Sequence, residues 1–346
     1  MDSSTRVQTS VGVVPVSEIR ETTSLLPSGT SVVGESLDRL GLLHHNRRRE
    51  TVGLGLMALS ALGFSAMSLF VKWSGATFPT LEIVFARSIW QLTLALLWCL
   101  YLRQNPLGPA RMRGWLLLRG TSGTLGLACF FYGLTHLPLA DATVIFFTGP
   151  VFTAILAHVA LNETFTRVDK IASGLCLLGI VLVAKPSFIF GIGHAADDLL
   201  FGRLLAVCLT LLGAALSAVG YVIVRKVGGQ VHFLTHVIYF GGLSTVFAAV
   251  GMLSGGPGAF VWPRGLEEYG LLTAVGMAAF VGQVFLNKGL QLCRAGPATL
   301  MRNLDVVFAF IFGITIFHEI PDVLSITGAL IIVTCTVGMG LKKWLN

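Results

Sequence analysis

The chain has 346 residues, 54% of them hydrophobic and only 12% charged, and its formal net charge at pH 7 is +7. Because soluble globular chains carry roughly 25% charged residues, this composition excludes a soluble domain. Apolar runs recur along the whole chain, which indicates an all-α, multi-pass membrane protein embedded in the lipid bilayer. The basic residues lie between these runs, where membrane proteins carry them, so the positive charge does not indicate a nucleic-acid partner.

The first 46 residues differ from the rest of the chain. They are rich in Ser, Thr and Gly, carry scattered charges and contain no continuous apolar run. Such a segment cannot bury enough apolar surface to order itself. We therefore predict a disordered tail over residues 1–46, followed by the basic Arg47–Arg49 run at the first apolar segment.

Ten apolar segments follow, each close to the ~20 residues that cross a hydrocarbon core. Pro and Gly residues separate them, as expected for the connections between helices. We place the ten predicted transmembrane helices near residues 52–72, 80–102, 114–135, 139–161, 168–185, 203–224, 233–254, 269–292, 295–317 and 322–341.

The basic residues collect on alternate loops, and this bias predicts that both termini lie in the cytosol. The membrane itself is not specified: the plasma membrane and the Golgi, ER or endolysosomal membranes all fit. The six cysteines lie in or beside apolar runs and form no CxxC pair. We therefore expect no metal site, and small apolar packing roles for the cysteines.

Two segments share a cadence although they lie far apart in the chain. Residues 140–163 read ADATVIFFTGPVFTAILAHVALNE, and residues 296–319 read GPATLMRNLDVVFAFIFGITIFHE. Around them, residues 52–185 align with residues 203–341. Each half holds five predicted spans, and an odd number makes the second half enter the membrane from the opposite face. This pattern predicts an inverted repeat, an architecture typical of secondary transporters that work by alternating access.

These segments resemble the EamA-type repeats of the drug/metabolite transporter superfamily. The sequence is most similar to the G subgroup of the solute carrier 35 family in three motifs: LADATVIFFTGPVFTAI, AGPATLMRNLDVVFAFIF and the Arg-Gly pair at 119–120. The resemblance implies a ten-helix solute transporter, often an exchanger or antiporter, with one five-helix repeat in residues 47–186 and a second in residues 187–346. Some members of this family move nucleotide sugars or other organic anions.

Ionisable residues deep in the predicted spans are candidates for the cargo site, because each costs at least ~2.5–3.5 kcal/mol to insert. Arg87 and Arg302 lie roughly 10 Å inside their spans, and Asp305 lies near the midplane. Asp305 is three residues from Arg302, so the two are expected to share a helix face, either as a self-neutralised pair or as part of a site. Arg87 has no acidic partner on its own span. Deep cations outnumber deep anions, which favours a small organic anion as the partner.

Further residues are weaker candidates. Gln283, Tyr239 and Asn303 are polar and lie within spans, where helix–helix hydrogen bonds are the commoner role. Lys288 is retained as a candidate although it lies near a span end, where it can snorkel to the interface. The same interfacial position is expected for Arg119 and Lys226.

Gly149 and Pro150 lie in the middle of the fourth predicted span. Proline removes one helix hydrogen bond there, so the pair predicts either a static kink or a gating hinge.

The sequence leaves three functions open. The leading one is a secondary transporter of a small organic anion, of the carboxylate, phosphorylated-compound or nucleotide-sugar class. The alternatives are a proton-coupled exporter of a neutral or cationic metabolite, with Asp305 as the proton carrier, and a membrane partner that regulates another protein without transporting. We find no nucleophile–base pair, phosphate-binding loop, cofactor motif or metal constellation, so we predict no enzyme activity and no cofactor. A homodimer is compatible with the sequence.

Overall fold

The computed structural model describes residues 6–9, 12–15, 32–137, 139–164, 166–184, 189, 200–255, 260–318 and 322–345. The chain divides into two compact units, Met1–Arg49 and Glu50–Asn346. The predicted boundary between the two repeats, at residues 186–187, lies outside the described residues.

The first unit contains a short hairpin in which strand β1 (Arg6–Thr9) pairs antiparallel with strand β2 (Gly12–Pro15). Helix α2 (Val32–Ser74) also begins within this segment. The sequence predicts a disordered tail over residues 1–46, so these elements differ from that expectation. An isolated two-stranded hairpin is marginally stable in water, and disorder of the tail in solution stays a prediction.

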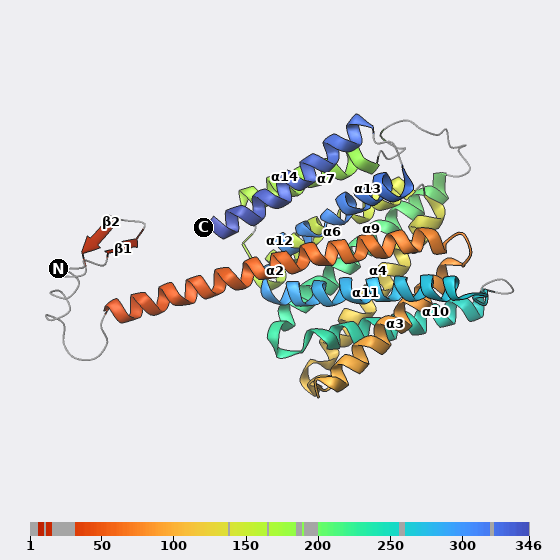
Figure 1. The fold of residues 1–346 in the computed structure, drawn as a ribbon, viewed down its shortest axis with the longest axis horizontal. Helices are drawn as coiled ribbons and strands as arrows, with labels where there is room; N and C mark the ends of the chain where they lie inside the picture. Colours follow the sequence, from red (N-terminus) through yellow and green to blue (C-terminus); the bar gives the residue numbers. More distant parts are fainter. Residues whose placement is uncertain are drawn as a thin grey trace. The chain divides into compact units, whose positions relative to one another are not determined.

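In the second unit, every element within the described residues is a helix (Figure 1). The helices that follow α2 are α3 (Thr80–Tyr101), α4 (Arg113–His136), α5 (Leu139–Phe146), α6 (Gly149–Leu161), α7 (Arg167–Ala184), α9 (Leu200–Val227), α10 (Phe233–Ser254), α11 (Leu266–Leu292), α12 (Ala295–Met301), α13 (Leu304–Phe317) and α14 (Val323–Leu345), with short 3-10 turns at Ala110–Met112 and Gly228–Gln230.

Within the described residues, seven helical segments are long and apolar enough to cross a membrane, and the shorter Val323–Gly338 segment is also apolar. The chain is therefore an integral membrane protein, but fewer segments meet this description than the ten that the sequence predicts. Helix α4 is long enough, yet its glycines and threonines lower its hydropathy. Helix α7 begins with the charged residues Arg167, Asp169 and Lys170.

Two of the apolar segments are interrupted near their middle, at matching places in the two halves. Helix α5 ends at Phe146 and α6 begins at Gly149, so Pro150 falls in the first turn of α6, where its missing N–H costs no hydrogen bond. The second break lies at Arg302 and Asn303, between α12 and α13. The first break lies beside the Gly149–Pro150 pair that predicts a kink, whereas the second has no proline and was not predicted.

The broken segments also end alike. The residues that follow α6 and α13, Asn162 and His318, both have left-handed backbone with φ of 53°. Asn and His are among the non-glycine residues that adopt this conformation most readily. Both halves therefore repeat the break and the helix end, as well as the sequence cadence.

Helices of one half pack on helices of the other at glycines. A Cβ added to Gly126 of α4 would lie 2.9 Å from the Gly213 carbonyl of α9, and a Cβ added to Gly63 of α2 would lie 2.9 Å from the Gly282 amide of α11. The first helix of each half thus packs on the third helix of the other. Helices α3 and α10 also pack together, as do α7 and α14 (Figure 1).

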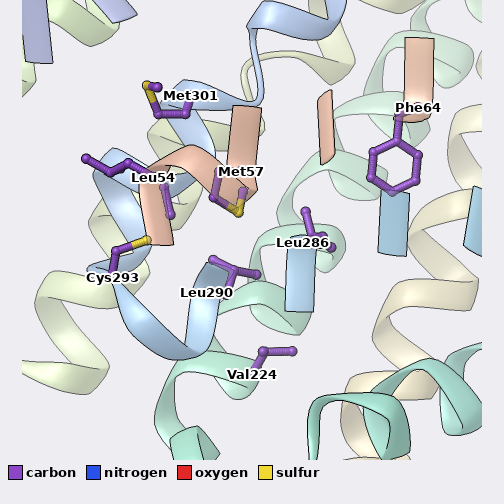
Figure 2. Packing of buried hydrophobic residues seen from close by; sticks show 9 residues of the cluster. Leu54, Met57, Phe64, Val224, Leu286, Leu290, Cys293 and Met301 are labelled. Carbon is purple, nitrogen blue, oxygen red and sulfur yellow. The ribbon is translucent and has the colours of Figure 1, made fainter. Parts of the chain in front are cut away.

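An apolar cluster fills the contact between α2 and α11. Leu54 and Met57 of α2 lie against Leu286 and Leu290 of α11, and Val224 of α9 borders them (Figure 2). Lipid tails are as apolar as these side chains, so close packing rather than exclusion from water holds such helices together. The cluster joins α2, α9 and α11.

Candidate functional site

A cavity of about 340 Å³, counted with its mouth, lies where the two broken segments meet α9. Its lining comes from both breaks and from small and aromatic residues: Phe146, Phe147, Gly149, Pro150, Ala214, Ser217, Tyr221, Thr299, Arg302 and Asn303. The fold therefore brings the candidate hinge pair, Gly149 and Pro150, to the same cavity as the candidate ligands Arg302 and Asn303. Arg302 is the charged residue of this lining.

Arg302 is held by aromatic groups. It follows the last residue of α12, and its Nη1 donates a hydrogen bond to the Tyr221 hydroxyl of α9. Its guanidinium carbon stands 4.7 Å from the centre of the Phe64 ring and 5.5 Å from that of Tyr221. Its Nε has no hydrogen-bond partner among the described residues. The side chain is thus oriented by cation–π contacts and keeps donor capacity for a ligand.

Arg302 and Asp305 form no ion pair in the structure, although they are three residues apart. The two residues were expected to share one helix face, but the break puts Arg302 after α12 and Asp305 in the first turn of α13. No ion pair joins Arg302 to any carboxylate in the part of the chain that the structure describes. Asp305 is 9% exposed and lies at a helix N-terminus, where the backbone dipole favours a negative charge.

Two further arginines lie inside the helix bundle. Arg87 of α3 is buried as expected, and Arg119 of α4 is 2% exposed, although its sequence position predicts an interfacial side chain. Both guanidinium groups stand over the Phe240 ring of α10, at 5.7 Å and 5.1 Å from its centre. Gly220 of α9 lies beside the Arg119 side chain, and the next residue, Tyr221, binds Arg302. Three arginines therefore share one region of the bundle.

The error over Arg119 has a physical reason. Its depth was judged from its distance to the predicted helix end, but Arg119 is buried on a helix that packs against α9 and α10. Space for its guanidinium comes from Gly123, where an added Cβ would overlap Nη1 of Arg119, and from Gly220 of α9. The glycines spaced three apart after Arg119 are the sequence signal that could have indicated this slot.

The remaining candidates lie elsewhere or pair with each other. Gln283 accepts a hydrogen bond from Asn287 within α11. The Tyr239 hydroxyl donates to the Leu107 carbonyl at 3.1 Å, in the connection before α4. Lys288 extends over the Phe233 ring at 5.3 Å. None of these three is among the residues that line the cavity.

A polar junction joins the ends of several helices away from the cavity. Glu163, just after α6, accepts hydrogen bonds from Arg225 Nε of α9 at 2.8 Å and from the Ala295 amide of α12 at 2.9 Å. Arg294 donates to Thr164 at 2.7 Å and to Glu50 at 3.2 Å. We refer to these residues as the Glu163 junction. Glu319, which matches Glu163 in the repeat, lies outside the described residues.

No group of three or more His, Cys, Asp or Glu side chains that could hold a metal ion occurs among the residues described. The polar chemistry near the cavity is dominated by guanidinium, amide and hydroxyl groups. Such groups bind and orient an acidic solute; they offer no activated nucleophile.

Comparison with known proteins agrees with this architecture. The model of the EamA-like transporter family matches residues 51–185 and again residues 204–341. Human solute carrier family 35 member G1 is 33% identical over 295 residues, which cover 84% of this chain and 80% of that protein. The pseudopaline exporter of Pseudomonas aeruginosa is 32% identical, covering 84% of this chain and 96% of its own.

A more distant relative is the S-adenosylmethionine uptake transporter of Rickettsia bellii, 27% identical over 83% of this chain and 92% of its own length. A solved crystal structure superposes with a TM-score of 0.71 at 16% identity, over 84% of this chain and 97% of that one, and shows that the fold is shared. The named relatives are transporters rather than enzymes. With both halves matched by the family model, the chain is a membrane protein of the EamA-like transporter family.

Proposed function

We propose that this chain is a secondary transporter of a small organic anion, of the carboxylate, phosphorylated-compound or nucleotide-sugar class. The observation that carries the proposal is Arg302, which lines the cavity and forms no ion pair with a carboxylate among the described residues. Buried charges in membranes are otherwise paired. An anionic cargo would supply the missing charge, and the planar guanidinium suits a carboxylate or phosphate.

Alternating access follows from the repeat. We propose ten spans in two inverted five-helix halves, in which α5 with α6 and α12 with α13 each count as one broken span. The exchange of packing between α2 and α11 and between α4 and α9 supports a two-fold relation of the halves. The breaks at Gly149–Pro150 and Arg302–Asn303 would serve as the hinges, because they interrupt the helical hydrogen bonding beside the cavity.

A screen for stabilising ligands tests the proposed cargo class. Purified protein would be melted in the presence of organic anions, inorganic phosphate, nucleotide sugars and amines. A ligand that binds only the folded state raises the melting temperature by mass action, so an organic anion should raise it while the amines leave it unchanged. Stabilisation by amines alone would contradict the anion proposal. The cargoes named for two relatives, pseudopaline and S-adenosylmethionine, differ, and the second is a sulfonium compound, so these names do not select an anion.

The proton-coupled alternative rests on Asp305, which is buried and has no ion-pair partner among the described residues. The variant Asp305→Asn separates the two functions. If Asp305 only moderates the positive field, transport by the variant should weaken but keep its pH profile. If Asp305 carries a proton, transport should lose its pH dependence. Uptake into proteoliposomes over a pH series distinguishes the outcomes, with wild type as the reference.

We also propose that both termini and the loop at residues 162–170 face the cytosol, from the distribution of basic residues. Asn162-Glu163-Thr164 is a glycosylation sequon, and a cytosolic sequon stays unmodified. The electrophoretic mobility of the chain expressed in cells should therefore not change on glycosidase treatment. A sequon inserted after Gly255, by contrast, should be glycosylated. Glycosylation at Asn162 itself would show that the orientation is inverted.

A purely regulatory, non-transporting role would leave the buried arginines without a purpose, since a scaffold gains nothing from inserting them. Homodimerisation and the identity of the membrane stay predictions. Cross-linking in native membranes tests the first, and imaging of the tagged full chain tests the second.

A further inference from the structure

A second group of buried polar side chains lies between α3, α4 and α10, outside the lining of the cavity. We name it the α3–α4–α10 cluster: Arg87, Gln91, Arg119 and His236, with the Phe240 ring between the arginines. Each polar member is more than nine-tenths buried; the most exposed, Arg87, is 6% exposed. The cluster thus concentrates polar groups in the interior of the helix bundle.

Many of its polar atoms have no partner. Nε of Arg87, Nε of Arg119, both side-chain polar atoms of Gln91 and both ring nitrogens of His236 are buried without a hydrogen bond among the described residues. Buried polar atoms in folded proteins are paired in about nine cases of ten. These six atoms lie on α3 and α4 and on α10, which packs against both, and they leave hydrogen-bonding capacity that the described residues do not use.

The electrostatics indicate the sign of that occupant. Bringing a charged group into a protein interior costs several kcal/mol per ion, and here two like charges lie on one aromatic ring. A cation–π contact with Phe240 returns only part of this cost for Arg87 and Arg119. No carboxylate pairs with either arginine within the described part of the chain. A negatively charged group from outside the chain would compensate the charge of the two arginines.

Two glycines leave the space that the Arg119 guanidinium occupies. A side chain at Gly123 would overlap its Nη1 and approach the Phe240 ring at 2.9 Å, and a Cβ at Gly220 would lie 3.4 Å from its Cδ and Nη1. Gly220 immediately precedes Tyr221, the hydroxyl acceptor for Arg302. Helix α9 therefore carries, on adjacent residues, the slot for Arg119 and the support for Arg302.

We propose that Arg119, together with Arg87, Gln91 and His236, forms a second acid-binding subsite that takes one carboxylate or phosphate group. Two planar guanidinium groups, an amide and an imidazole supply N–H donors for the oxygens of such a group. The inference deepens the proposed function and rests on it, because the acidic group would belong to the transported anion. Arg302 and Arg119 would then each bind an acidic group, at two separate sites of the same transporter.

The test is calorimetric titration of the purified full chain with two probes, inorganic phosphate and acetate, at constant ionic strength. Wild type should bind two equivalents of at least one probe. The variant Arg302→Gln should lose one binding event, and Arg119→Gln should lose the other or weaken it by about 10- to 100-fold, the usual effect of removing a charged hydrogen-bond donor. Binding of phosphate alone, or of acetate alone, would identify which acid the subsite fits.

Variants at glycine positions keep every charged group and test the subsite independently of the arginine variants. Gly123→Ala should weaken the same event as Arg119→Gln, because the new methyl group displaces the guanidinium. Gly114→Ala on the same helix is the matched control, since a Cβ there meets nothing within 4 Å. Should Arg119→Gln not fold, Arg119→Lys keeps the charge without the planar fork and should show a smaller loss of the same event.

The outcomes separate the two proposals. If Arg119→Gln and Gly123→Ala both bind like wild type while Arg302→Gln loses an event, the second subsite is wrong and the proposed function stands. If Arg119→Gln loses an event and Arg302→Gln does not, the subsite stands and the cargo site at Arg302 is wrong. Absence of anion binding to wild type by both probes would overturn the subsite and leave the unpaired atoms to water.

Discussion

Replacing Arg302 with alanine is expected to abolish transport of the anion while the chain stays folded and correctly localised. The substitution removes the charge that lines the cavity, together with its bond to Tyr221. Each hydrogen bond to a charged group contributes about 1.5–3 kcal/mol, so a doubly bonded cargo should lose roughly 100-fold or more in affinity. Uptake of an anion found by the stability screen, measured in proteoliposomes, gives the rate.

The control is Lys226→Ala. Lys226 is also a cation on the protein's helices, but it lies at the end of α9, over the Trp115 ring at 4.2 Å. This variant should transport at close to the normal rate. The comparison then shows whether transport depends on the charge in the cavity or on positive charge in general. Arg87→Lys tests geometry, because lysine cannot supply the planar fork. A folded Arg302→Ala/Arg87→Ala double variant with normal transport would falsify the anion site.

The second large effect is expected at the Glu163 junction. Glu163→Gln keeps the size of the side chain but removes the charge that binds Arg225 and the Ala295 amide. Losing a partly buried, charged hydrogen bond costs about 1–2 kcal/mol, which changes a two-state ratio roughly 5- to 30-fold. Because the junction connects α6 to α9 and α12, we expect the bundle to open more often at this end and transport to fall.

The rate at which Cys293 is labelled by a maleimide measures that opening. Cys293 lies between α11 and Arg294 and is 1% exposed. In a chain whose other five cysteines are replaced, a water-soluble maleimide should label Cys293 faster in Glu163→Gln than in the parent. The matched control is Glu268→Gln, whose carboxylate binds the Arg264 amide at the start of α11, the end opposite to Cys293. Equal labelling rates together with unchanged transport would show that the junction does not limit opening.

Much of the fold follows from patterns within single segments. Apolar runs of membrane-crossing length predict helices because the bilayer leaves the backbone no other partner. The matched cadences predict the repeat, and Gly149–Pro150 predicts one break. Arg87 is predicted to lie roughly 10 Å inside its span, too deep to reach the interface easily, and it is buried in the structure.

Features that depend on partners distant in sequence could not be predicted in this way. The break at Arg302 has no proline or glycine to indicate it, and a continuous helix would have put Arg302 and Asp305 on one face. Burial of Arg119 depends on Gly220, about a hundred residues away, and on Phe240 of another helix. Tyr239 and Lys288 were judged by depth along their helices, but their contacts with Leu107 and Phe233 direct them away from the cavity.

The exchange of helices between the halves bears on how the chain is made. Ser60 of α2 donates a hydrogen bond to the Gly282 carbonyl of α11, a residue 222 positions later. At synthesis rates of about 5–20 residues per second, the small-residue face of α2 waits roughly 10–45 s in the membrane for its partner to be translated. During that interval the Ser60 hydroxyl and the Gly63 surface face lipid or an insertion factor. Cells should therefore recognise a nascent first half as incomplete, and a chain truncated before α11 should be degraded even though it contains the whole of the first family match, residues 51–185.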